Sequence, residues 1–296
     1  MAGKIEIPEN LKAELPPSQW GKVLSATPIV MTVIATMLAG LASSEMTKAQ
    51  YDRSLAAQLQ SKAGDQWGYA AAKKTRGAMA HNSLDVLLAT AEVHPLDAAA
   101  LPGLDGATAE ALAKGALPAF ERGKFSPPIQ GALDALARSV AEKDLAGQLE
   151  KIKIADLAGA LDSALAAALA FDNAAKPVTK AADKLGESVA AAGDKMATAS
   201  LVAARLRYTS ARYDAEAQLN QDIAGIYELE IRKANVTADK HHARSGKFFY
   251  GMLAAQAAVI IATFAIAARK KNFLWSIAAA AGVLAVAFSI YVYLYI

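Results

Sequence analysis

The stretch that decides the fold lies at the C-terminus: FFYGMLAAQAAVIIATFAIAA at 248–268, the basic turn at 269–272, and FLWSIAAAAGVLAVAFSIYVYLYI at 273–296. Neither apolar run contains a charged side chain. A helix rises ~1.5 Å per residue and a bilayer core is ~30 Å thick, so each run is long enough to cross a membrane. The two runs therefore predict a membrane hairpin.

A third apolar run, at 23–43, follows a polar segment at 1–22. A cleaved signal peptide is the alternative interpretation of this run. The side chains of the preceding segment carry no net positive charge, and the run exceeds the roughly 7–15 apolar residues of a signal peptide. We therefore expect three transmembrane helices, at 23–43, 248–268 and 273–296.

The composition excludes several classes of function. The net charge is +3 and the basic residues alternate with acidic ones, so no nucleic-acid partner is indicated. The chain has no cysteine, which excludes disulfides, thiolate catalysis and cysteine-ligated metals. Phosphate-binding loops, zinc-protease motifs and nucleophile elbows are absent from the sequence, and no charge lies inside an apolar run. We expect no catalytic residue, no metal site and no cofactor.

Prolines divide the region between the first and second spans. The residue before a proline avoids the α conformation, so His94-Pro95 and Lys176-Pro177 are predicted helix boundaries. We predict a first stalk helix at 44–94, a helical head at 95–176 and a second stalk helix at 177–247. The expected fold class is an all-α integral membrane protein with a long antiparallel helical stalk and a helical head.

Two apolar patterns predict how these helices pack. In the head, four leucines recur every fourth residue after Ile154, which predicts one apolar stripe: Leu157, Leu161, Leu165 and Leu169. In the second stalk helix, a 4-3 spacing predicts a coiled-coil seam formed by Val178, Ala182, Leu185, Val189, Ala192, Met196 and Ala199.

If both stalk helices leave the membrane together, residues equally far from it should face each other. Paired residue numbers then add up to about 291, because the rise per residue is the same in both helices. This register places Trp67 opposite Ala224-Gly225. It also predicts the charge pairs Arg53 with Asp239, Glu45 with Lys247, and Asp85 with Arg205 and Arg207.

Four residues of the first stalk helix form a candidate interaction site. Asp65, Tyr69 and Lys73 share one helical face, and Trp67 lies beside them. A ligand or partner site is the functional interpretation, and a contact between helices anchored by Trp67 is the structural one. The run Asp65-Gln66-Trp67-Gly68-Tyr69 with Ala72-Lys73 resembles the D-Q-W-x-Y-x-x-A-K helix of an uncharacterised bacterial membrane-protein family, a domain of unknown function. That resemblance implies one N-terminal span and a C-terminal two-span hairpin, and it implies no activity.

The basic turn indicates the orientation. Arg269, Lys270 and Lys271 form a short basic loop, which the positive-inside rule places in the cytoplasm. The N-terminus is then cytoplasmic and residues 44–247 are periplasmic, in a bacterial inner membrane. Six basic residues flank the membrane on each proposed side, and the short loop decides between them because long domains count less under this rule.

A second candidate group lies just before the second span. His241, His242, Arg244 and Lys247 are predicted to contact lipid headgroups. Metal or haem ligation is the alternative, but adjacent histidines on a helix point about 100° apart, so one chain cannot chelate a metal with both.

These features favour a membrane-anchored scaffold or assembly protein that acts through self-association and partner binding, without catalysis. The expected partners are membrane lipids, further copies of the chain and a protein of the envelope or of a membrane complex. An oligomeric channel or mechanosensitive pore is one alternative. An accessory subunit of a larger membrane complex, such as a redox complex, is the other.

Overall fold

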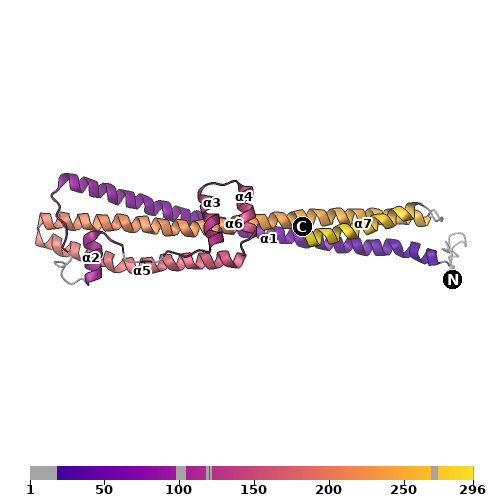
Figure 1. Cartoon of the computed structure of the whole chain (residues 1–296), viewed down its shortest axis with the longest axis horizontal. Helices are drawn as coiled ribbons and strands as arrows, with labels where there is room; N and C mark the ends of the chain where they lie inside the picture. The colour runs from indigo at the N-terminus through magenta and orange to yellow at the C-terminus, as the bar shows by residue number, and fades with distance from the viewer. Residues whose placement is uncertain (1–18, 98–104, 118–119, 121, 268–272, 296) are drawn as a thin grey trace, which may run out of the picture. The chain divides into compact units, whose positions relative to one another are not determined.

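The computed structural model describes residues 19–97, 105–117, 120, 122–267 and 273–295, and every regular element in these ranges is a helix. The basic turn 269–272 lies outside the described residues. Figure 1 shows the order of the helices. They are α1 (Gln19–Thr90), α2 (Gly106–Lys114), α3 (Pro127–Ala137), α4 (Glu142–Glu150), α5 (Ile154–Ala192), α6 (Lys195–Ala267) and α7 (Phe273–Tyr295).

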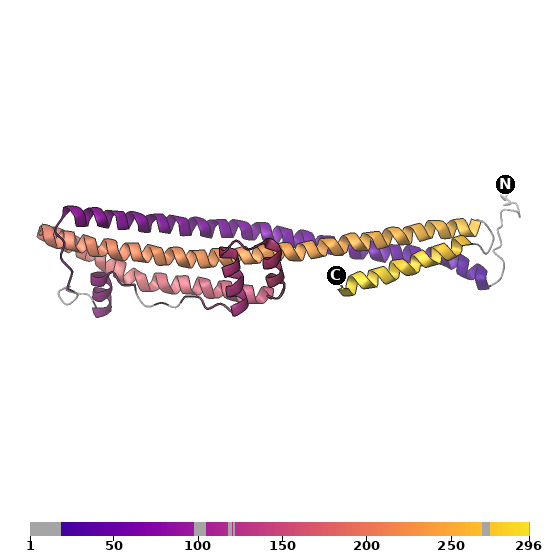
Figure 2. The same cartoon turned by 45° about the horizontal axis from the view of Figure 1, so that its top comes forward.

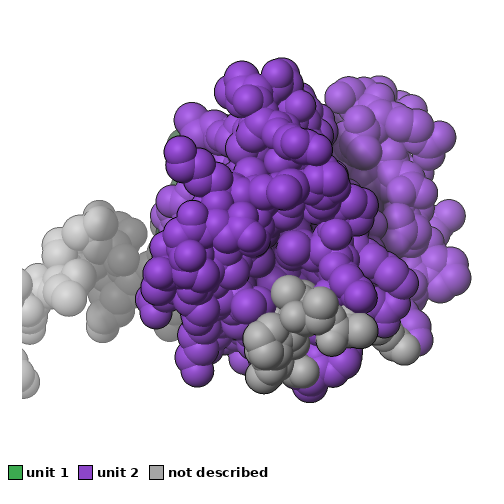
Figure 3. Space-filling model, turned by 90° about the vertical axis from the view of Figure 1, so that its left-hand side faces the viewer, with its two compact units in different colours: residues 1–53, 237–296 green, residues 54–236 purple. Residues whose placement is uncertain are grey.

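The chain divides into two compact units. Unit 1 comprises residues 1–53 and 237–296, and unit 2 comprises residues 54–236. The two units have different colours in Figure 3, where an end of unit 2 faces the viewer. The long helices α1 and α6 contribute to both units, and in each unit they lie side by side (Figures 1 and 2).

Unit 1 is a bundle of α1, α6 and α7. Small residues let these helices approach closely: a Cβ at Gly282 of α7 would collide with Met31 of α1. A Cβ at Gly251 of α6 would lie 3.0 Å from Ser289 Oγ and 3.4 Å from Leu38 Cδ1. Within the described residues, four helices are long and apolar enough to cross a membrane. They are α1, α6 and α7, which contain the three expected spans, and α5, whose residues were expected in the head and the second stalk helix.

A column of small side chains runs along α1. Every seventh residue from Ala35 to Gly77 is buried, and the column consists of Ala35, Ala42, Ala49, Ala56, Ala63, Ala70 and Gly77. The facing column on α6 also repeats every seven residues and is small except at Ile231: Ala203, Ser210, Ala217, Ala224, Ile231, Ala238 and Ser245. A seven-residue repeat is the spacing of a coiled-coil seam, and small residues there allow the helix backbones to come close together.

Two serine hydrogen bonds fix the register of this seam. In unit 1, Ser245 Oγ donates to the carbonyl oxygen of Ala42 at 2.7 Å. In unit 2, Ser210 Oγ donates to the carbonyl oxygen of Gly77 at 3.1 Å. Both pairs of residue numbers add up to 287, close to the expected 291, so the helices are antiparallel in each unit.

The predicted charge pairs meet with different outcomes. Arg53 Nη2 lies 3.3 Å from Asp239 Oδ1, which confirms that pair. The pairing of Glu45 with Lys247 is wrong, because the register is shifted by about one helical turn and Glu45 meets His241 instead.

Among the described residues, Asp85 forms an ion pair with neither of its predicted partners, Arg205 and Arg207. Arg205 binds Asp183 at 2.6 Å, and Asp85 lies 3.8 Å from His81 on its own helix. The expected partner of Arg205 was therefore wrong, because α5, which the register did not include, supplies the closer carboxylate.

The predicted boundary at Pro177 is wrong. Helix α5 continues through Pro177 to Ala192, and Gly193 with φ 71° ends it in the left-handed conformation. Asp194 then starts α6, because its Oδ1 accepts hydrogen bonds from the backbone N–H groups of Met196 and Ala197. A proline removes one helical hydrogen bond, which surrounding packing can offset.

The predicted leucine stripe is wrong for a geometric reason. Only Leu157 is fully buried, whereas Leu165 and Leu169 are exposed. A spacing of four residues rotates by about 40° per step around a helix, so such a stripe leaves the core within three steps. The buried face of α5 instead follows a spacing near 3.5 and is mostly alanine: Leu157, Ala160, Ala164, Ala167, Phe171, Ala175 and Val178.

The predicted seam at 178–199 is interrupted. Val178, Ala182 and Leu185 are buried with Leu112 of α2 and Tyr208 of α6. Met196 is exposed because it lies beyond the break at Gly193.

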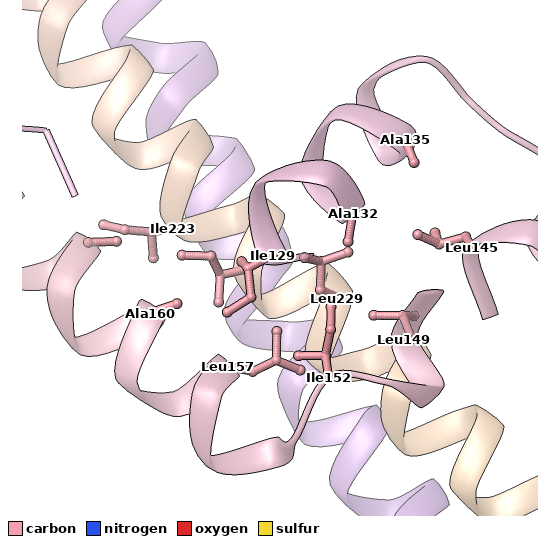
Figure 4. Close-up of a cluster of buried hydrophobic side chains, with 12 residues drawn as sticks. Ile129, Ala132, Ala135, Leu145, Leu149, Ile152, Leu157, Ala160, Ile223 and Leu229 are labelled. Atoms are coloured by element: carbon pink, nitrogen blue, oxygen red, sulfur yellow. The ribbon is translucent and has the colours of Figure 1, made fainter. Parts of the chain in front are cut away.

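The largest apolar core of unit 2 lies where α3 and α4 cover α5 and α6. Figure 4 shows Ile129 of α3, Leu149 of α4, Leu157 of α5 and Leu229 of α6 converging there. Ser126 precedes α3 and Pro127 is its first residue, a position that suits proline because its missing N–H would have no partner within the helix there. Leu145 of this core also lines a cavity in unit 2.

Candidate functional site

Unit 2 contains a cavity of about 760 Å³. Its walls come from α1, the segment 122–125, α3, the turn at 139–140, the start of α4 and the middle of α6. Pockets that bind small molecules usually measure about 300–1,000 Å³ and combine an apolar lining with a few polar groups. The cavity is therefore the strongest candidate for a binding site in the described residues.

One wall is formed by an arginine–carboxylate pair. Arg122 Nε and Nη2 both approach the Asp222 carboxylate, at 3.2 Å to Oδ2 and 2.8 Å to Oδ1. This two-point contact fixes the planes of both groups. It also ties the segment before α3 to α6.

A second arginine is held in a similar way. Arg232 Nη2 donates to Glu228 Oε1 at 3.0 Å, and Arg232 Nη1 lies 3.7 Å from Glu142 Oε1 at the start of α4. Arg232 Nε is buried and has no hydrogen-bond acceptor among the described residues. On α3, Gln130 Nε2 donates to Asp134 Oδ1 at 2.9 Å.

The remaining walls are apolar. They include Phe125, Leu133, Leu136, Val140 and Leu145. Leu133 packs on the backbone of Gly225, since a Cβ added there would lie 3.0 Å from Leu133 Cδ2. The expected register set Trp67 opposite Ala224-Gly225. The structure has Leu133 in that space, and Trp67 lines the same cavity with 42% of its surface exposed.

The structure separates the four candidate residues on α1. Trp67 lines the cavity, whereas Asp65 and Tyr69 are exposed and line no part of it. Lys73 turns towards α6 and lies 2.5 Å from Glu216 Oε2. Among the described residues, the four side chains therefore form no common pocket, although they share one segment of helix.

Lys73 belongs to a contact that joins three helices. Glu216 of α6 also lies 3.3 Å from Arg212 Nε, and Arg212 Nη1 donates to Thr179 Oγ1 of α5 at 2.9 Å. Lys73 and Arg212 both lie over the ring of Tyr213, at 5.3 and 4.7 Å from its centre. This cluster locks α1, α5 and α6 together and explains the position of Lys73 without a ligand.

The second candidate group, in unit 1, is divided between two environments. His241 was predicted to face lipid headgroups but faces α1, where its Nδ1 lies 2.6 Å from Glu45 Oε2 and its Nε2 lies 4.0 Å from Asp52 Oδ2. Position 241 falls on the face of α6 that forms the seam, which is why the His241 side chain meets α1. His242 is exposed.

The other two members of the group are partly buried. Arg244 and Lys247 are intermediate in exposure, and Arg244 Nε has no hydrogen-bond partner among the described residues. The topology determinants Arg269, Lys270 and Lys271 lie outside the described residues. Within the part of the chain that is described, no group of three or more histidine, aspartate or glutamate side chains could hold a metal ion.

Glu45 is the most buried acidic residue in this part of the chain. Burial alone would raise the pKa of its carboxyl, but hydrogen bonds from Lys48 and His241 outweigh burial and hold the pKa below its ordinary value. Lys48 Nζ lies 2.7 Å from Glu45 Oε1. The carboxylate is therefore charged and doubly paired inside the seam.

Most residues of the cavity were not foreseen from the sequence. Arg122 and Asp222 are 100 positions apart, and neither stands out in its local sequence. Trp67 was among the candidate residues because it lies beside the face shared by Asp65, Tyr69 and Lys73 and within the D-Q-W-x-Y-x-x-A-K motif. Comparison with known proteins found no match, either among family models or among curated proteins and solved structures.

Proposed function

We propose that this protein is a membrane-anchored helical scaffold that acts through self-association and partner binding and catalyses no reaction. The observation that carries the proposal is the continuity of its two long helices. Helix α1 runs unbroken from Gln19 to Thr90 and α6 from Lys195 to Ala267, and each contains both an apolar segment and a long polar one. Such helices suit the display of an extramembrane surface at a membrane.

The outward surface of unit 1 supports membrane insertion. Large apolar side chains are exposed on all three of its helices: Ile29 and Val33 on α1, Ile260 and Phe264 on α6, and Val283 and Leu284 on α7. Large apolar side chains that are exposed together are unfavourable in water and favourable in lipid. The proposed spans are 23–43, 248–268 and 273–296.

Helix α5 is not among the proposed spans, although its length and composition would allow it. It carries Asp156, Asp162 and Asp172 in and beside its apolar half. Charged side chains are costly inside a bilayer. Its buried face packs on α6 and on α3 and α4, so the protein core already accounts for much of its apolar character.

The proposed orientation follows the basic turn. Arg269, Lys270 and Lys271 would lie in the cytoplasm, with the N-terminus on the same side and residues 44–247 in the periplasm of a bacterium. Lipid headgroups are the proposed contacts of His242, Arg244 and Lys247. Further copies of the chain and an envelope or membrane-complex protein are the proposed protein partners.

Purification in a mild detergent followed by native mass spectrometry tests the self-association. We expect a particle with more than one copy of the chain and with bound lipid. A monomer at concentrations well above the micromolar range would contradict the proposal.

The orientation has a separate test, which uses the absence of native cysteine. Gln58→Cys introduces one exposed thiol on α1. A maleimide that cannot cross membranes should label this variant in intact cells and should not label Lys4→Cys until the cells are broken. The reverse pattern would invert the proposed topology.

A further inference from the structure

We infer that the cavity of unit 2 binds a neutral, hydroxyl-rich ligand with an apolar face, which is the chemistry of an oligosaccharide. The site lies wholly within residues 54–236. It therefore does not depend on how the chain crosses the membrane or on whether it acts as a scaffold.

The charges of the lining disfavour a strongly charged ligand. Arg122 is bound at two points by Asp222, and Arg232 is bound by Glu228, so each cation already has a carboxylate within about 3 Å. A charged ligand that took the place of one member of either pair would break that pair. Breaking such a pair leaves its other member without a partner.

The same ion pairs retain hydrogen-bonding capacity for a neutral ligand. A guanidinium has five N–H donors and a carboxylate can accept about four hydrogen bonds, so one pair does not exhaust either group. A hydroxyl group both donates and accepts, so the hydroxyls of one ligand match both the arginine N–H groups and the carboxylate oxygens of this lining.

Trp67 supplies the flat apolar surface that the inference requires. The C–H face of a sugar ring stacks on an aromatic ring, and an indole offers the largest such surface among side chains. Trp67 remains 42% exposed although it lines the cavity, so part of its ring is open to a ligand. Leu133, Leu136 and Val140 line the same cavity and add further apolar surface.

Isothermal titration calorimetry of the full-length protein tests this assignment. The probes are chitotriose and maltotriose, with decanoate and tetramethylammonium as representatives of anionic amphiphiles and cations. The detergent must lack a sugar headgroup, because an alkyl maltoside would compete for the site. We expect saturable binding of at least one trisaccharide, with a dissociation constant of about 1 mM or tighter, and no binding of the charged probes.

Two variants locate the binding. Trp67→Ala should weaken trisaccharide binding at least about tenfold, because it removes the stacking surface. Tyr69→Ala is the matched control: it removes an exposed aromatic ring two residues away that does not line the cavity, and it should bind as the wild type does.

A third variant guards against a misfolded Trp67→Ala protein. Gln221 is an exposed residue of the cavity lining, so Gln221→Ala should weaken binding with the helical circular dichroism unchanged. The inference is overturned if neither trisaccharide binds at about 10 mM. It is also overturned if a charged probe binds in their place, or if Trp67→Ala and Gln221→Ala both bind as the wild type does.

Discussion

His241 and Glu45 meet inside a seam that is otherwise lined mainly by alanine and serine: Nδ1 of the histidine lies 2.6 Å from Oε2 of the glutamate. The glutamate is 8% exposed, and Lys48 is its second partner. A buried carboxylate that loses a partner keeps its desolvation cost without the compensating interaction. The pair therefore makes this part of unit 1 sensitive to single substitutions.

His241→Ala is predicted to destabilise the protein by about 1–3 kcal/mol, because Glu45 loses one of its two hydrogen-bonding partners. Thermal unfolding followed by circular dichroism in detergent measures the loss. His242→Ala is the matched control, because the neighbouring histidine is exposed, and it should change the midpoint little. Equal effects of the two substitutions would show that His241 does not stabilise the seam.

Acid should remove the same interaction. The folded-state pKa of Glu45 lies below its ordinary value, so its contribution to stability is present above the ordinary carboxyl pKa and is lost as the pH falls through the lowered one. The difference in unfolding midpoint between the wild type and Glu45→Gln should therefore shrink at acidic pH. A difference that grows on acidification would contradict the assignment.

The register of α1 and α6 in unit 2 predicts which cysteine pairs crosslink. Ala56 and Ala234 belong to the same buried cluster, so Ala56→Cys with Ala234→Cys should form a disulfide under mild oxidation. Asn235 is exposed, so Ala56→Cys with Asn235→Cys should crosslink far less. Non-reducing gel electrophoresis distinguishes the two pairs, and no native cysteine interferes. Preferential crosslinking of the control pair would refute the register.

Small side chains in the seam should be intolerant of larger ones. Ala63 is 2% exposed in the column that faces α6, so Ala63→Leu forces the two helices apart and should cost about 1–3 kcal/mol. Ala57→Leu makes the same change at an exposed position of the same helix and should be nearly neutral. Urea or thermal unfolding of both variants compares them. A neutral Ala63→Leu would mean that the helices are not in close contact there.

The sequence predicts the long helices because apolar segments and helix-forming residues both indicate helix over many consecutive turns. The register also follows to within about one turn, since two straight helices that leave one surface together have few ways to pair. The seam of α1 is visible as alanine at every seventh position, but alanine is so frequent in this chain that the repeat does not stand out from its background.

Other features depend on contacts that no local pattern encodes. The Arg122–Asp222 pair joins residues 100 positions apart, and the cavity exists only because α3 and α4 fold over α6. Pro177 is a strong local signal for a helix boundary, yet packing of α5 on α6 overrides it. The true boundary, Gly193-Asp194, is also a local signal, since glycine ends helices and aspartate starts them.

The break between α5 and α6 predicts opposite effects at two glycines. Gly193 has φ 71°, where a side chain is strained, so Gly193→Ala should destabilise the protein by about 1 kcal/mol. Gly186 lies inside α5, and a Cβ there would be 3.9 Å from the nearest atom, so Gly186→Ala should stabilise the protein by about 0.5–1 kcal/mol. Thermal unfolding measures both. Changes of the same sign in the two variants would contradict the boundary.

Glu230 of α6 predicts a stability change in the opposite sense to Glu45. Burial raises the pKa of its carboxyl, and nearby Asp162 adds to the rise, while Lys62 offsets part of it. An acid with a raised folded-state pKa stabilises the fold below its ordinary pKa, and this stability is lost as the pH rises through the raised value.

Glu230→Gln removes the charge and keeps the shape, so it should be more stable than the wild type at neutral pH and should converge with it in acid. Glu187→Gln, at an exposed position of α5, is the matched control and should change the unfolding midpoint little. Thermal unfolding midpoints measured from acidic to neutral pH test this prediction. A Glu230→Gln protein that is less stable than the wild type at neutral pH would show that the Glu230 carboxylate is favourably paired in the folded state.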